Sequence, residues 1–107
     1  MSKKAAIEIN VKTGVIKVEE KYILKLFITG ITTHSVRAVI NCKSLCEKYL
    51  ENRYELDIID IYQQPELAHS EDIIAVPVLI KKFPLPEERV IGDLSDTSKV
   101  LKELDLI

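Results

Sequence analysis

The side chains best suited to chemistry are two cysteines, Cys42 and Cys46, and two histidines, His34 and His69. The cysteines form a CxxxC pattern, which places them one turn apart on a single helix face, unlike the CxxC of dithiol enzymes and zinc ribbons. Free cysteine is among the most buried residue types, so we interpret the pair as small core residues. The histidines and scattered carboxylates show no metal-ligand spacing, and the sequence therefore predicts neither a metal site nor a resident cofactor.

A helix that follows a strand is a second place to look for a reactive group, because its N-terminus stabilises a thiolate or an oxyanion. Here that place holds the sequence ITTHS, residues 31–35, which contains no cysteine. Ser35 is interpreted as a helix cap. With three glycines in the chain there is also no loop that could cradle a phosphate. The prediction is a protein that is not an enzyme.

The length and the charge of the chain limit its domain number and the kinds of partner it can bind. A chain of 107 residues is expected to form one domain with a core of its own. Its net charge of −2, with both signs mixed along the chain, argues against a nucleic-acid partner. No apolar run approaches the roughly 20 residues that span a membrane, and the start lacks a signal peptide. We therefore expect a cytoplasmic protein without a membrane partner.

The elements that must position these residues begin with a hairpin. Residues 7–12 and 15–18 alternate apolar and polar side chains around Thr13-Gly14, which predicts two short antiparallel strands within an extension of residues 1–20. Residues 22–29, YILKLFIT, are almost wholly apolar and predict a central strand covered on both faces.

A helix and a second strand follow. Thr32, Thr33 or Ser35 can cap the helix, and residues 54–62 alternate well enough to close a βαβ unit. Polar residues such as Arg37 and Asn41 fall outside the predicted apolar stripe of the helix. That stripe comprises Val36, Val39, Ile40, Cys42, Leu45, Cys46, Tyr49 and Leu50.

All four prolines lie from residue 65 onward, at positions 65, 77, 84 and 86. Pro65 suits the first position of a short helix. Residues 73–80, IIAVPVLI, fit a buried strand or a buried helix equally well, and Pro77 makes the bond before it a candidate cis peptide or an edge start. Residues 88–91 predict a short strand, and Ser95 is expected to cap a final helix with Val100, Leu101 and Leu104 in its apolar stripe.

This order, βαβ, short α, then ββα with a candidate cis-proline before the third of these strands, is a thioredoxin-like α/β arrangement. The stretches YILKLFITGITTHSVRAV, LDIIDIYQQPELA and IIAVPVLIKKFPLPEERVIGDLSD closely resemble the KaiB family of circadian clock proteins over residues 21–107. The resemblance implies one domain over this range, behind the extension.

The resemblance further implies a non-enzymatic regulator that binds a KaiC-like ring ATPase and modulates its phosphorylation cycle. Family members are known for two folds: a thioredoxin-like monomer bound to the partner, and a resting form, usually a tetramer, with a rearranged C-terminal half. Because residues 71–96 suit helix and strand alike, we link them to that change as a hypothesis. The chain is expected to associate with itself as a dimer or tetramer.

Individual residues can be carried over from the family. Arg37 in SVRA, and secondarily Lys25, match positions associated with the partner surface, although a solvated helix charge explains Arg37 equally well. Pro77, Gly92 and Asp93 match places whose geometry differs between the two folds, while Gly92-Asp93 is also an ordinary strand-to-helix turn. Gln63, with its neighbour Gln64, stands where many clock members have a lysine, so a charge is missing from the surface thought to meet KaiC.

Other departures and alternatives remain open. The acidic C-terminal tail of many clock members is missing and the N-terminal stretch is longer, so we expect a homologue outside the core oscillator that serves stress response or signalling. One alternative is a redox or glutathione-binding enzyme, with Ser35 and the segment around Pro77 at its site. Another is a stand-alone sensor domain like that of SasA-type kinases, although the chain ends at Ile107 with no kinase following.

Overall fold

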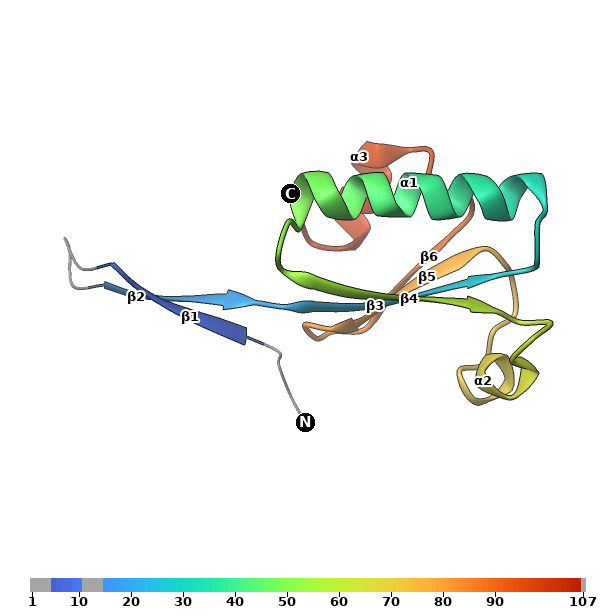
Figure 1. Ribbon diagram of the computed structural model, residues 1–107, viewed down its shortest axis with the longest axis horizontal. Coiled ribbons are helices and arrows are strands. Elements are labelled where there is room, and N and C mark those ends of the chain that lie inside the picture. Colours follow the sequence, from blue (N-terminus) through green and yellow to red (C-terminus); the bar gives the residue numbers. More distant parts are fainter. Residues whose placement is uncertain (1–4, 11–14, 107) are drawn as a thin grey trace.

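The computed structural model describes residues 5–10 and 15–106. Its main body is a four-stranded sheet in the order β4-β3-β5-β6, with α1 and α3 on one face and α2 on the other (Figure 1). The nine elements of the described residues are β1 (Ala5–Asn10), β2 (Val15–Glu20), β3 (Tyr22–Ile28), α1 (Thr33–Tyr49), β4 (Tyr54–Asp60), α2 (Pro65–Ser70), β5 (Val78–Phe83), β6 (Glu88–Ile91) and α3 (Thr97–Glu103). The thioredoxin-like prediction is therefore confirmed.

β3 is the central strand, as its apolar sequence predicted. It pairs in parallel with β4 and antiparallel with β5, and β5 pairs antiparallel with β6. Leu24 and Leu26 face the main core under α1 and α3, whereas Phe27 faces a smaller core under α2. Burial on both faces explains why this strand reads as a continuous apolar run.

The predicted N-terminal hairpin is present. β1 and β2 pair antiparallel, with Ile7 opposite Val18 and Ile9 opposite Ile16. The turn expected at Thr13-Gly14 lies outside the described residues. β2 leads almost directly into β3, so the hairpin continues along the direction of β3 and extends beyond one end of the strands of the four-stranded sheet (Figure 1).

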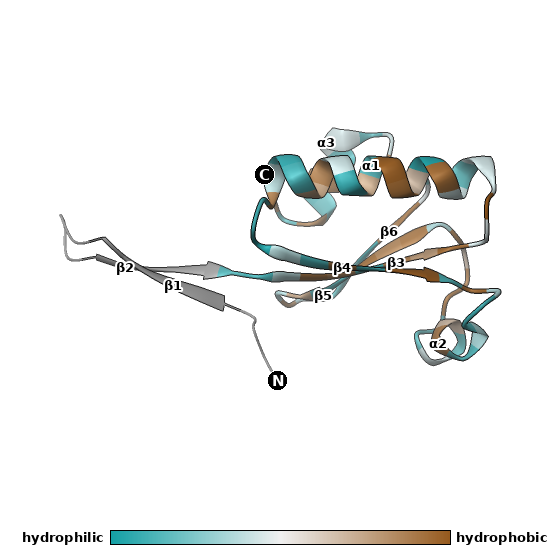
Figure 2. Cartoon of the chain, viewed as in Figure 1, coloured by the Kyte–Doolittle hydropathy of each residue, from teal (hydrophilic) through white to brown (hydrophobic). Residues whose placement is uncertain are grey.

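α1 begins where the sequence allowed, with Thr32 as its N-cap: the Thr32 hydroxyl accepts a hydrogen bond from the Ser35 N–H. Its buried face corrects the predicted stripe. Ala38 and Ser35 are fully buried, while Val36 and Ile40 are 41% and 61% exposed. The reason is that α1 also lies beside β4, an edge strand, so no further strand covers that flank of its apolar stripe. Figure 2 shows the hydrophobic and hydrophilic residues that alternate along α1.

The ambiguous segment becomes irregular chain followed by strand. β5 starts only at Val78, directly after a cis Val76–Pro77 peptide bond, and the bonds before Pro84 and Pro86 are also cis. α3 is capped by Asp96, whose carboxylate accepts the Lys99 N–H, and not by Ser95 as predicted. Ser95 instead donates its N–H to the Asp93 carboxylate, because the chain turns once more before the helix begins.

The alternation along β5 separates two neighbouring lysines. Lys81 is only 1% exposed and its ammonium lies 3.6 Å from the Asp105 carboxylate after α3. Lys82 points to the opposite face, toward α2 and β6. Lys81 therefore forms a structural ion pair with Asp105 beside the main core. Lys82 is a cation on the opposite face of the sheet, the face that carries α2, which we call the open face. Within the described residues, no helix is both long and apolar enough to cross a membrane.

Candidate functional site

The residues that the resemblance assigned to the fold change meet at one end of the sheet. The Gly92 N–H donates to the Pro77 carbonyl oxygen at 2.9 Å, which joins the start of β5 to the end of β6. Asp93 follows directly and faces α1. The structure thus places Pro77, Gly92 and Asp93 in one continuous region, which we call the Pro77–Gly92 junction.

The backbone at this junction adopts unusual conformations. Gly92 has a φ of +115° and Leu94 a φ of +64°. A positive φ is uncommon for any residue other than glycine, and for a bulky side chain such as leucine it costs about 1–3 kcal/mol unless the surroundings hold it. Leu94 is only 4% exposed and packs in the main core, so burial of its side chain holds the turn.

Two side chains of α1 hold the Asp93 segment. The Asn41 amide donates to the Asp93 main-chain carbonyl at 2.8 Å, and the Arg37 guanidinium lies 4.0 Å from the Asp93 carboxylate. Hydrogen bonds from the Ser95 hydroxyl and N–H, and then the charge of Arg37, lower the pKa of Asp93 below its ordinary value. Two residues of the first half of the chain, both on α1, therefore bind the Asp93 end of the junction.

Arg37 itself remains accessible. Its side chain is 61% exposed, and its single ion pair with Asp93 is long, so this contact contributes little to stability. Beside it, α1 and the preceding loop present exposed apolar side chains, Ile31, Val36 and Ile40, around a shallow groove of about 230 Å³. A cation next to an apolar groove is a surface suited to a protein partner.

Lys25 and Gln63 lie elsewhere. Lys25 is on the α2 face of the sheet, 3.5 Å from the Glu71 carboxylate. Gln63 is exposed in the turn after β4, where its N–H donates to the Asp60 carbonyl at 3.0 Å. Among the described residues, no hydrogen bond or ion pair joins either side chain to Arg37, so the three predicted partner-binding residues do not form one cluster.

Sequence reasoning missed two residues of the junction, Asn41 and Leu94. Asn41 falls outside the predicted apolar stripe, and nothing in its spacing signals a partner that is 52 residues away. Leu94 lies in the IGDLSD motif, but a left-handed leucine has no sequence signature. The contributions of Asn41 and Leu94 are visible only in the three-dimensional structure.

The thiols and the Ser35 hydroxyl are not placed for catalysis. Cys42 and Cys46 are fully buried, and the pKa of the Cys42 thiol is raised, first by its hydrogen bond with Cys46 and then by burial. Ser35 is fully buried too, and its hydroxyl accepts the Thr29 N–H at 3.0 Å. No group of three metal-ligating side chains occurs among the described residues.

Comparison with solved structures identifies the fold alone, because the identities are low. The chain resembles chloroplastic thioredoxin z, with a TM-score of 0.66 at 15% identity over 80% of this chain and 78% of that one. It also resembles the N-terminal domain of SasA from Synechococcus elongatus, with a TM-score of 0.58 at 23% identity over 85% and 90% of the two chains.

Sequence comparison is more specific. The family model of the KaiB domain matches residues 25–106. The circadian clock oscillator protein KaiB of Synechococcus elongatus is 48% identical over 86 residues, which cover 80% of this chain and 84% of that protein. The circadian clock protein KaiB3 of Synechocystis sp. is 41% identical over 87 residues, covering 81% and 85%. The chain therefore belongs to the KaiB family.

Proposed function

We propose that this protein is a non-enzymatic regulator that binds a KaiC-like ring ATPase and modulates its phosphorylation cycle. The observation that carries the proposal is the match of residues 25–106 to the KaiB domain, together with clock relatives of 41–48% identity. The buried Ser35 and the buried thiols support a binding protein over a redox or glutathione enzyme, since none of them can reach a substrate. We treat residues 21–107 as the binding domain and residues 1–20 as an extension.

The partner surface that we propose is centred on Arg37. An exposed cation beside the apolar side chains of Ile31, Val36 and Ile40 offers one charge for steering and an apolar area for burial. We propose Gln63 as a separate contact point for the same partner, because it is exposed in the turn after the edge strand β4. Lys25 belongs to the partner surface only if Lys25 first leaves Glu71.

We also propose that the second half of the chain rearranges around the Pro77–Gly92 junction. Two features support this: the left-handed backbone at Gly92 and Leu94, and a segment whose sequence suits helix and strand alike. Two packings of one sequence can coexist when they differ by only a few kcal/mol. The other arrangement would be the self-associated one, a dimer or tetramer.

Size-exclusion chromatography with the KaiC-like ATPase of the same organism tests the main proposal. We expect co-elution that depends on whether ATP or ADP is bound, and a change in the ATPase's phosphorylation time course. Absence of co-elution with either nucleotide would overturn the proposed partner. Light scattering and NMR on the same samples report whether an oligomer with different secondary structure exists.

A second candidate is a stand-alone sensor domain similar to that of SasA. The observation in its favour is the shared fold with the SasA N-terminal domain over 85% of this chain. The two candidates differ in conformational behaviour. A sensor domain would keep the thioredoxin-like arrangement at every concentration, whereas a rearranging KaiB would show a second set of NMR signals.

A further inference from the structure

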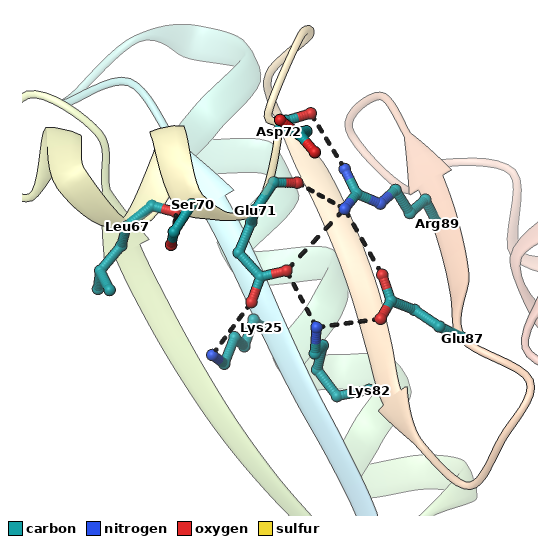
Figure 3. A network of polar contacts seen from close by, with 8 residues as sticks. All are labelled: Lys25, Leu67, Ser70, Glu71, Asp72, Lys82, Glu87 and Arg89. Atoms are coloured by element: carbon teal, nitrogen blue, oxygen red, sulfur yellow. Dashed lines mark hydrogen bonds and ion pairs between the residues drawn. The ribbon is translucent and has the colours of Figure 1, made fainter.

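The open face of the sheet carries a cluster of ion pairs around Glu71, which directly follows α2 (Figure 3). The Glu71 carboxylate lies 3.0 Å from Lys82, 3.5 Å from Lys25 and 3.9 Å from Arg89. These cations stand on β5, β3 and β6 respectively. One carboxylate, only 16% exposed, therefore contacts three of the four strands of the sheet.

Arg89 also holds the main chain of the same segment. Its guanidinium donates to the carbonyl oxygen of Glu71 at 2.6 Å and to that of Asp72 at 3.3 Å. Asp72 has a φ of +54°, so the chain reverses direction here. The side chain and the backbone at the end of α2 are thus fastened to β6 together.

The cluster is completed by Glu87, which lies 3.0 Å from Lys82 and 3.5 Å from Arg89. Three cations, Lys25, Lys82 and Arg89, therefore face two carboxylates, Glu71 and Glu87. The two glutamates do not play the same part, because Glu87 stands in the β5–β6 connection and its ion pairs among the described residues join it to Lys82 and Arg89 of that hairpin. Through its ion pairs, Glu71 links the loop before Pro77 to both halves of the chain.

Apolar packing holds this loop only in part: Ile73 and Val76 are half-buried against the smaller core, and Pro77 is buried. α2, all of which is described, contains no buried residue, and its Leu67 is only partly buried against the smaller core. Ile74, in the loop, is 96% exposed. The charged contacts around Glu71 therefore act together with partial apolar packing to fix the loop on the sheet.

We propose that Glu71 is an electrostatic clasp that holds residues 71–77 on the open face of the sheet, and that opening this clasp controls access to the rearranged form. The control of the rearranged form rests on the proposed rearrangement, whereas the clasp itself does not depend on it. Lys25 belongs to the N-terminal half and Lys82 and Arg89 to the C-terminal half, so the clasp joins the two parts whose relative arrangement is proposed to change.

Ordinary changes of pH would not open the clasp. Hydrogen bonding from Lys82 lowers the pKa of Glu71, and hydrogen bonds to Glu71 and Glu87 raise the pKa of Lys82. The stabilisation from Glu71 is present above its ordinary pKa and is lost in acid, and that from Lys82 is present below its ordinary pKa and is lost in alkali. Between these limits the clasp responds to salt or to a competing charge.

Amide hydrogen exchange followed by mass spectrometry tests the clasp, using Glu71→Gln and, as a matched control, Glu55→Gln. Glu55 is in an exposed pair with Lys21 at 3.8 Å, so its loss should change nothing. Glu71→Gln should speed exchange in peptides covering residues 71–77 by about tenfold, since a bond to a charged group is lost. Unchanged exchange there, or equal acceleration by both variants, would overturn the proposal.

The unmodified protein supplies a second measurement that needs no variant. Raising the salt concentration to about 1 M shortens the Debye length to about 3 Å and should speed exchange in the same peptides by about twofold. No response to salt would count against an electrostatic clasp.

The hold of Glu71 on residues 71–77 and its control of the rearrangement can be disproved separately. If Glu71→Gln loosens residues 71–77 but NMR shows no second arrangement in any sample, the clasp holds and the proposed rearrangement is wrong. If a second arrangement exists and its population is equal in Glu71→Gln and wild type, the rearrangement holds and the clasp does not control it.

Discussion

The Gly92 N–H donates to the Pro77 carbonyl oxygen at 2.9 Å, and this hydrogen bond ties the end of β6 to the start of β5. Gly92 makes the bond with a φ of +115°, a conformation that L-residues rarely adopt. The bond joins two of the residues assigned to the fold change, so the main chain at Gly92 is the most direct place to perturb it.

Gly92→Ala should destabilise the thioredoxin-like arrangement by about 1–3 kcal/mol. A Cβ at Gly92 meets no atom within 4 Å, so the cost is conformational and not steric. Urea denaturation followed by circular dichroism measures it. Gly30→Ala is a useful comparison, because its φ of +52° lies where other residues are better tolerated. A loss at Gly92 no larger than at Gly30 would contradict the argument.

Asn41→Ala removes the amide that donates to the Asp93 carbonyl at 2.8 Å. We expect a loss of about 1 kcal/mol in unfolding free energy, with faster amide exchange confined to residues 92–96. Ser44→Ala, one turn along the same helix at an exposed position, serves as the control. Equal effects of the two substitutions would show that the Asn41 contact does not hold the junction.

Arg37→Ala should weaken binding to the proposed KaiC-like ATPase while leaving stability nearly unchanged. The Arg37 side chain is 61% exposed and its contact with Asp93 is 4.0 Å long, so we expect less than about 0.5 kcal/mol in unfolding free energy. Lys99→Ala is matched to it, since Lys99 is 60% exposed in a 3.8 Å pair with Glu103. Titration calorimetry against the ATPase should separate the two variants; identical affinities would remove Arg37 from the partner surface.

Acid should weaken the protein through Glu71 and Asp93. Both carboxyl groups have a pKa lowered in the folded state, by the hydrogen bond from Lys82 and by those from Ser95 respectively. Their stabilisation is therefore complete above the ordinary carboxyl range and is lost as the pH falls below about 4. Urea midpoints across this range should fall less steeply in Glu71→Gln than in wild type. Parallel curves would refute the contribution of Glu71.

Tyr54 offers a spectroscopic test of the α1–β4 contact. Its hydroxyl donates to the Glu47 carboxylate at 2.6 Å, and this hydrogen bond raises the pKa of Tyr54 to about 12. In Glu47→Gln the titration of one tyrosine, followed by phenolate absorbance, should move down toward pH 10. Titration curves that superimpose would contradict the contact.

The fold could be predicted largely from local patterns. The apolar run at 22–28 and the helix after Thr32 were correctly interpreted because both are decided by burial and capping near in the sequence. The prediction that Val36 and Ile40 belong to the buried face of α1 was wrong, since an apolar stripe does not reveal that β4 ends the sheet. The cap of α3 was off by one residue, at Asp96.

The candidate site was less accessible to sequence reasoning. Its turn motif could be found, but a contact that holds it comes from Asn41, which is 52 residues from Asp93 along the chain. Single polar residues carry no periodicity, and an ion pair has no sequence signature beyond opposite charge. Residues whose contribution depends on a distant partner therefore require the structure.

The two cysteines of the chain are both free, fully buried and located on α1. They are the only thiols in the sequence, so wild-type protein already carries a chemical reporter at its centre. An alkylating reagent can reach either sulfur only when α1 lifts from the sheet. The rate of modification, measured by mass with and without the ATPase, would then count openings of the main core without any engineered label.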